Sequence, residues 1–138
     1  MTVTTKIDFR YRRVSQLEDI TDLVEVLCPG NRNQQHAAAR VLLELKTSQG
    51  PVASLSHLEK EHDISRRTLQ RTRAKLARLG LIEHVSLLNA RYGGQHGWKL
   101  SSRMSTALRQ LADRIDDWRR DTRQERREKD GVLVDLLR

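Results

Sequence analysis

The stretch from Ser65 to Gly80 has the clearest alternation of apolar and polar positions in the chain. Apolar or small side chains recur there at steps of three and four, which places them on one helix face. They are Leu69, Thr72, Leu76 and Leu79. Ser65 can cap the first turn, and Gly80 can adopt the left-handed conformation that ends a helix. The pattern therefore predicts a helix over Arg66–Leu79 with a buried apolar face.

The opposite face of this helix carries only basic and amide side chains, because no acidic residue occurs between Ser65 and Gly80. Its residues are Arg66, Arg67, Gln70, Arg71, Arg73, Lys75 and Arg78. Solvated helices usually mix both signs of charge in i,i+4 pairs. A face of one sign favours an anionic partner lying against it, and we interpret this helix as one that enters a DNA major groove. The alternative is a solvated face that holds the chain's surplus charge.

The segment before residue 15 alternates apolar and charged side chains. Residues 6–14 have the period of a half-buried strand, which would pair with a distant segment or with another copy of the chain. The alternative is a mobile basic arm that reaches DNA through Arg10, Arg12 and Arg13.

A capping-box pattern follows, with Ser15 at the cap and Glu18 three residues on. It predicts a helix that continues to Leu27 and ends at residues 28–30. The exposed side chains of this helix are acidic, so residues 15–28 are expected to face a positive surface of the protein itself, a sister chain or a protein partner. A simple solvated face is the alternative.

The next two helices are predicted from caps and apolar stripes. Residues 31–33 supply a cap for a helix over residues 34–46, and Ser54 or Ser56 caps a short helix that ends near His62. Asp63 and Ile64 then form a tight turn into the basic helix. Two helices joined by so short a turn predict a helix-turn-helix.

After Gly80 the apolar period changes to that of strands. Residues 81–88 and 97–101 are rich in strand formers, and residues 89–96 between them look like a glycine-rich hairpin tip. A phosphate-binding loop would need a helix after the glycines, so this interpretation is weak. The sequence predicts a β-hairpin.

The C-terminal part is predicted to form one long helix over residues 102–129. Its apolar residues are spaced four, three, four and three apart, as in a coiled-coil seam. They are Met104, Leu108, Leu111, Ile115 and Trp118. We expect a dimer contact along this seam, although the same stripe could instead pack on its own domain. Gly131 is expected to break the helix, and residues 132–138 form a short apolar tail that could bind a protein partner.

The composition limits the kinds of partner that the protein is expected to bind. The 138 residues suit one compact domain with appendages, and the net charge of +8 favours nucleic acid, or less readily an acidic membrane surface. A run of about 18 or more apolar residues, as a membrane span needs, is missing, and the N-terminus has no signal-like apolar core. We therefore expect a cytoplasmic, nucleoid-associated protein without membrane contact.

Enzyme chemistry is not indicated. The five histidines are scattered, and His57 and His62 do not converge on one metal. The single cysteine, Cys28, is interpreted as a small buried hydrophobe rather than as a redox or ligand sensor. The few aromatics argue against single-stranded nucleic acid. We predict no catalysis, no metal and no cofactor.

The order of elements resembles winged helix-turn-helix DNA-binding proteins, with a layout like that of the MarR-like and PadR-like regulators. The resemblance is carried by Leu55, Leu58, Ile64, Ser65, Thr68, Leu69, Leu76, the Leu-Gly-Leu-Ile junction at 79–82, Gly93, Gly94 and residues 98–100. It implies a mainly α fold with a small β-hairpin (α+β), divided into an N-terminal extension at 1–33, a DNA-binding domain at 34–101 and a dimerisation helix with its tail at 102–138.

The resemblance also implies a function, which is sequence-specific binding of double-stranded DNA by a homodimeric transcriptional regulator. Residues 65–79 would lie in the major groove, and a wing at 89–97 would lie on the minor groove or backbone. The candidate DNA-binding residues are Ser65, Arg66, Arg67, Thr68, Gln70, Arg71, Lys75, Arg91, Tyr92, Gln95 and His96. The alternative is a DNA-coating or assembly protein, for plasmid partition or replication, that uses the same domain.

Overall fold

The computed structural model describes residues 5–86 and 95–138. The chain divides into two compact units, unit 1 at Met1–Met104 and unit 2 at Ser105–Arg138. In chain order the elements are α1 (Tyr11–Val14), α2 (Ile20–Leu27), α3 (Arg32–Thr47), α4 (His57–Glu61), α5 (Arg66–Leu79), β1 (Ile82–Val85), β2 (Gly97–Leu100), α6 (Arg103–Arg120) and α7 (Gln124–Asp135). The predicted mainly helical fold with a small antiparallel sheet is confirmed.

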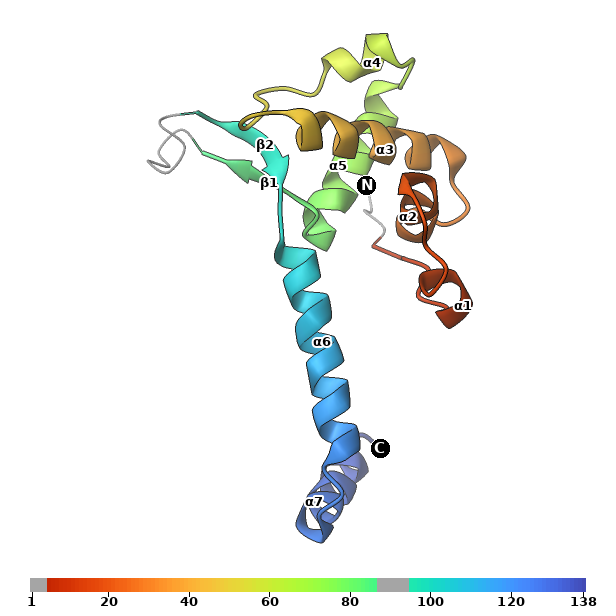
Figure 1. Ribbon diagram of the computed structural model, residues 1–138, viewed down its shortest axis with the longest axis vertical. Helices are drawn as coiled ribbons and strands as arrows, with labels where there is room; N and C mark the ends of the chain where they lie inside the picture. The colour runs from red at the N-terminus through yellow and green to blue at the C-terminus, as the bar shows by residue number, and fades with distance from the viewer. Residues whose placement is uncertain (1–4, 87–94) are drawn as a thin grey trace. The chain divides into compact units, whose positions relative to one another are not determined.

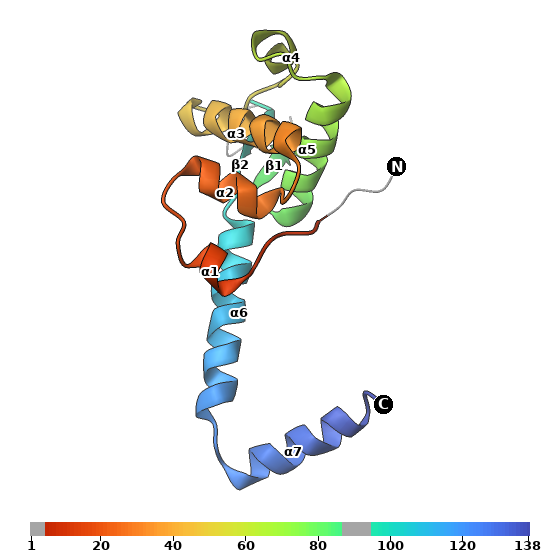
Figure 2. The same cartoon turned by 90° about the vertical axis from the view of Figure 1, so that its right-hand side faces the viewer.

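The core of unit 1 lies among α2, α3 and α5. Figure 1 shows α3 crossing α5, and Figure 2 shows α2 beside α3. Side chains from these helices form one apolar cluster with Leu55, Leu58 and Ile82. The N-terminal segment 1–33, expected as a region of its own, therefore contributes α2 to the same core as the central segment.

Helix α5 has the predicted bounds and the predicted caps. The Ser65 hydroxyl accepts a hydrogen bond from the Thr68 amide at 3.1 Å. Gly80 is left-handed, with φ of 88°, and the Leu81 amide donates to the Leu76 carbonyl at 2.9 Å. This bond satisfies a carbonyl that the end of the helix leaves unpaired.

Helices α3 and α4 also follow their predicted patterns. The Asn31 side chain accepts from the Gln34 amide at 3.0 Å, so α3 begins within two residues of the expected start. Ser56 occupies the N-cap of α4 without a side-chain cap bond. The Ser54 hydroxyl instead accepts from the Ser56 amide at 3.2 Å, which shapes the entry to the helix.

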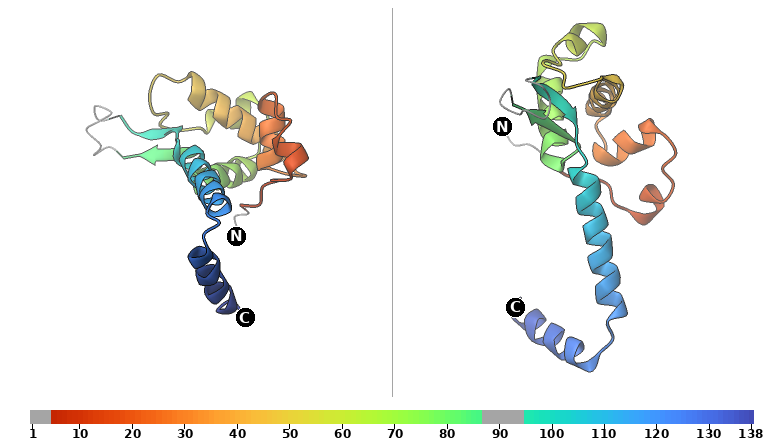
Figure 3. Two further views of the ribbon diagram at one scale, coloured as in Figure 1. Left: turned by 60° about the horizontal axis from the view of Figure 1, so that its bottom comes forward. Right: turned by 60° about the vertical axis from the view of Figure 1, so that its left-hand side comes forward.

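The predicted hairpin strands are present as an antiparallel pair, visible in both views of Figure 3. His84 lies opposite Trp98 in the register. Val52 forms an additional bridge to Trp98, with both backbone bonds at 2.8 Å. Gly97, at φ +128°, is required there because a Cβ would collide with the Val52 carbonyl. The predicted tip at 89–96 lies outside the described residues except for Gln95 and His96.

The N-terminal predictions were wrong. Residues 5–10 form no strand, and Tyr11–Val14 is a single helical turn. The segment is instead held at single points: the Asp8 amide donates to the Val26 carbonyl at 2.8 Å, and the Lys6 carbonyl accepts from the Lys75 ammonium at 2.8 Å. Neither bond is part of a strand ladder. The acidic helix begins at Ile20 rather than at Ser15, because the Asp19 carboxylate accepts from the amides of Thr21 and Asp22.

The prediction of a single long C-terminal helix was also wrong. Helix α6 ends at Arg120, where the Asp121 carboxylate accepts from the Arg123 guanidinium at 2.9 Å. Helix α7 then continues through Gly131, the predicted break. A lone glycine weakens a helix by about 1 kcal/mol without ending it. Most of the predicted apolar tail is therefore the last part of α7.

In the described part of the chain, none of the helices combines the length and the apolar character that a membrane crossing requires.

Candidate nucleic-acid interface

The candidate interface is built on α4, the turn after it and α5. The Ile64 amide donates to the Glu59 carbonyl at 3.0 Å, and the Ile64 side chain is buried in the core. Asp63 has φ of 53°, in the left-handed region that aspartate tolerates better than most residues. Residues 62–65 thus join α4 to α5. In the first two turns of α5, Leu69 is buried in the core, and the side chains on the other side of the helix face solvent.

The exposed side of these first turns carries the predicted basic and amide residues. Arg66, Arg67, Gln70 and Arg71 are all exposed, and Thr68 is half-buried behind the cap. Arg66 lies 3.7 Å from Glu59, yet its side chain remains 78% exposed. The predicted residues Ser65 to Arg71 thus lie together on one open surface, where they can reach a ligand.

Lys75, predicted to bind DNA, is buried in the core. Only 2% of it is exposed, and its ammonium donates to the Lys6 carbonyl at 2.8 Å. Burial lowers the pKa of Lys75, and the nearby Cys28 thiol opposes this shift. The prediction was wrong because the spacing of charges describes a helix surface, whereas the N-terminal segment and α2 cover this part of it.

A second cation of the basic face is used for packing. The Arg73 guanidinium lies over the Trp98 ring at 4.9 Å from its centre, and the His84 ring meets the same indole edge-on at 5.0 Å. The contact joins α5 to the sheet. Charge alone did not indicate it, although an arginine facing a tryptophan is a recurrent pairing.

The sheet side of the site is described only in part. Gln95 and His96 are exposed just before β2, and Arg91 and Tyr92 lie outside the described residues. At the base of the sheet, Lys99 lies 3.0 Å from Glu83. Hydrogen bonding from Lys99 is the main cause that lowers the pKa of Glu83. Glu83 and Lys99 are directly opposite in the register of the two strands, and Arg103 lies 3.3 Å from the same carboxylate.

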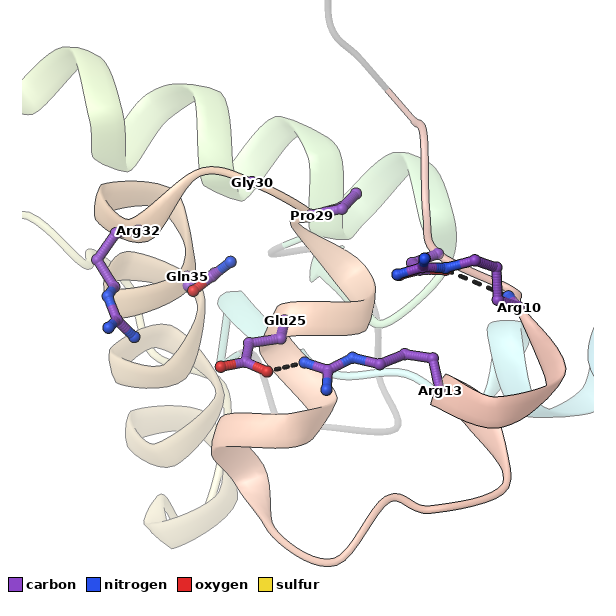
Figure 4. Close-up of a pocket in the computed structure, with 8 residues that line it drawn as sticks. Arg10, Arg13, Glu25, Pro29, Gly30, Arg32 and Gln35 are labelled. Carbon is purple, nitrogen blue, oxygen red and sulfur yellow. Dashed lines mark hydrogen bonds and ion pairs between the residues drawn. The ribbon is translucent and has the colours of Figure 1, made fainter.

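The N-terminal arginines lie in ion pairs beside a polar hollow of about 490 Å³ (Figure 4). Arg10 pairs with Asp8 at 2.9 Å, and Arg13 pairs with Glu25 on the acidic helix α2. The acidic face of α2 thus meets a positive group of the protein itself, one of the contacts expected from the sequence. Of the three arginines of the predicted basic arm, Arg13 is bonded to α2, whereas Arg10 pairs only within its own segment and remains 82% exposed, and Arg12 is exposed.

The predicted seam residues differ in their surroundings. Met104 is half-buried against the core of unit 1. Leu108, Leu111, Ile115 and Trp118 are exposed. The Trp118 indole donates to the Asp130 carboxylate at 3.1 Å, a bond between α6 and α7.

Residues 5–86 and 95–138 contain no group of three or more His, Cys, Asp or Glu that could hold a metal ion. Comparisons with protein-family models, with curated proteins and with solved structures found no match.

Proposed function

We propose that this protein binds double-stranded DNA sequence-specifically, as a homodimeric transcriptional regulator with a winged helix-turn-helix domain. The single observation that carries the proposal is the open surface of Arg66, Arg67, Gln70 and Arg71 on α5. Three cations and an amide on adjacent turns of a helix that contains no Asp or Glu suit the edges of bases and the phosphates around them. In this proposal, the protein acts on the nucleoid in the cytoplasm.

The proposed mechanism divides affinity from specificity. Arg66, Arg67 or Arg71 would make a bidentate pair with guanine, and Gln70 with adenine, each discriminating by about 1–3 kcal/mol. Neutralised phosphates would supply most of the affinity, so log K would fall with log salt at about −0.9 per phosphate contact. A dimer would present its two α5 helices about 34–36 Å apart, one turn of the duplex.

The sheet has the position in the chain that a wing requires, directly after the recognition helix. Gln95 and His96 are exposed at its free end, and the Arg73–Trp98 contact joins β2 to α5. In the proposal, the hairpin touches the minor groove or the backbone beside the major-groove contact. The proposed wing contact and the proposed base contacts therefore both depend on the position of α5.

The test begins with selection of a preferred duplex from random DNA, followed by fluorescence anisotropy on that duplex and on an unrelated one. Arg71→Ala is expected to weaken specific binding about 5- to 150-fold and non-specific binding much less. Arg127→Ala in α7 removes the same charge from an exposed site elsewhere and serves as the matched control. Failure of the wild-type chain to bind any duplex at low salt would contradict the proposal.

A DNA-coating or assembly protein is the second candidate. The observation in its favour is the exposed apolar stretch at the end of α7 and just after it, with Val132, Leu133, Val134, Leu136 and Leu137. Footprinting separates the two functions. One protected two-fold site of constant length indicates a regulator, whereas protection that spreads as the concentration rises indicates a coating protein.

A further inference from the structure

Unit 2 carries apolar side chains that nothing within it covers. All of its residues are described, and none of them is buried. On α6, Leu111, Ile115 and Trp118 are 54%, 53% and 64% exposed and follow one face together with Leu108. Contiguous exposed apolar faces mark interfaces. The face therefore suits a partner surface that is itself apolar.

We propose that this partner is α6 of a second copy, paired in antiparallel orientation with Leu108 of one copy opposite Leu111 of the other. The proposal deepens the homodimer of the proposed function and rests on it for the presence of two copies. It adds the direction of the helices and the residues that determine this direction.

The flanks of the seam argue against a parallel pair. With Leu108 and Ile115 at position a and Leu111 and Trp118 at position d, Arg114 falls at g and Arg119 at e. In a parallel coiled coil, residue g of one helix lies beside residue e of the next heptad in the other. Arg114 would therefore meet Arg119 of the second copy on both sides. Asp116 pairs with Arg119 at 3.2 Å on its own helix, which reduces this repulsion but does not remove it.

The antiparallel pair avoids the clash. Antiparallel helices bring g beside g and e beside e, so in the proposed register Arg114 lies beside Ala107 of the second copy. Ser105 similarly lies beside Ala112. The bulky Trp118 then lies at the end of the seam, where α6 of the other copy begins and has the small Ser105 in its first turn. Opposed helix dipoles favour the same orientation.

Cysteine crosslinking of the full chain tests the direction. Leu108→Cys and Leu111→Cys chains, mixed and oxidised, are expected to form a mixed crosslinked dimer. Ile115→Cys alone is expected not to crosslink, because its two copies would lie about 16 Å apart along the axis, at 1.5 Å per residue. These sites are exposed, so the changes leave the core intact, and the wild type, whose only thiol is the buried Cys28, reports the background.

Two charge variants give an independent reading through the dimer dissociation constant measured by sedimentation velocity. Ala107→Glu is expected to tighten the dimer several-fold, because it would face Arg114 of the second copy. Arg114→Glu is its matched control and would tighten only a parallel dimer, by facing Arg119. Ready self-crosslinking of Ile115→Cys, or tightening by Arg114→Glu alone, would overturn the proposal.

DNA affinity is measured separately from dimerisation. Leu111→Glu should make the chain monomeric and lower its affinity for a two-fold site far more than for a half-site. If the crosslinks follow the antiparallel pattern but no duplex is bound, the proposed function fails and the dimer stands. If duplex DNA is bound by a chain that stays monomeric at every concentration, or that is held by another protein through α6, the antiparallel dimer is wrong and DNA binding stands.

Discussion

The two halves of α5 carry similar charge and have opposite surroundings. Arg66, Arg67 and Arg71 on the first turns are exposed, whereas Lys75, about one turn after Arg71, is 2% exposed and bonded to a backbone carbonyl. Arg73, between them, lies against Trp98. The difference teaches that a run of cations on one helix is not one surface, because tertiary neighbours decide which of them can meet a ligand.

The cause of the difference is what covers each half. In the first turns Leu69 packs into the core and the arginines remain exposed, whereas Lys75 is covered by the N-terminal segment and lies near Cys28 at the C-cap of α2. A buried ammonium is costly unless it is hydrogen-bonded. The Lys6 carbonyl accepts that bond from Lys75. Lys75 therefore holds the N-terminal segment to α5, although a lysine would ordinarily be expected to face solvent or to bind DNA.

The largest expected effect concerns Lys75. Lys75→Ala should lower the free energy of unfolding by about 2–4 kcal/mol, because it leaves a cavity and an unpaired carbonyl. Lys75→Met keeps most of the volume and removes the charge, so it should cost much less. Urea unfolding followed by circular dichroism measures both. Equal, small losses would show that Lys75 is not packed in the core.

The next largest expected effect is on DNA affinity, for one substitution in each half of α5. Arg67→Ala should weaken binding to the selected duplex about 5- to 150-fold without changing stability, because the side chain is exposed. Lys75→Met should leave the affinity nearly unchanged. Anisotropy titrations at one fixed salt concentration compare the two variants. A large loss of affinity with folded Lys75→Met would place both halves of α5 on the DNA.

The third prediction uses pH. Burial lowers the pKa of Lys75 below its usual 10.5, so at this site the unfolded chain binds more protons and stability rises with pH up to that value. Burial raises the pKa of Cys28 above its usual 9.0, so at that site the folded chain binds more protons and stability falls as pH rises beyond 9.0.

These two contributions oppose each other in the wild type, and variants separate them. Unfolding free energies measured from pH 8 to 10.5, stepping across the two usual values, should fall more steeply in Lys75→Met than in the wild type. In Cys28→Ala they should fall less steeply than in the wild type. Identical slopes in all three proteins would mean that neither group is desolvated by folding.

The smallest expected effect concerns Arg73. Arg73→Met removes the contact with Trp98 and should lower the free energy of unfolding by about 0.5–1 kcal/mol. Arg78→Met, at an exposed site on the same helix, is the control and should change stability less. Tryptophan fluorescence is a second measurement. The emission of Trp98 should change in Arg73→Met, which removes the guanidinium over its ring, and should not change in Arg78→Met.

Local signals predicted much of unit 1. Ser65 and Gly80 bounded α5, Asn31 capped α3, and the change of period after Gly80 predicted both strands. The same kind of signal failed at Ser15 and Gly131. Asp19 is a competing cap nearer the apolar run, and a single glycine does not outweigh the helix on either side of it. Such competitions depend on small differences in free energy that one pattern cannot rank.

By itself, the sequence determined where α5 starts and stops, which of its sides is apolar, and that its other side carries no negative charge. These properties depend on neighbours within a few residues, through capping bonds and helical periodicity. Only the tertiary structure decided that Lys75 and Arg73 belong to packing and Arg66 to Arg71 to the open surface. That division depends on Lys6, Cys28 and Trp98, which are distant along the chain and reach α5 only when the core has formed.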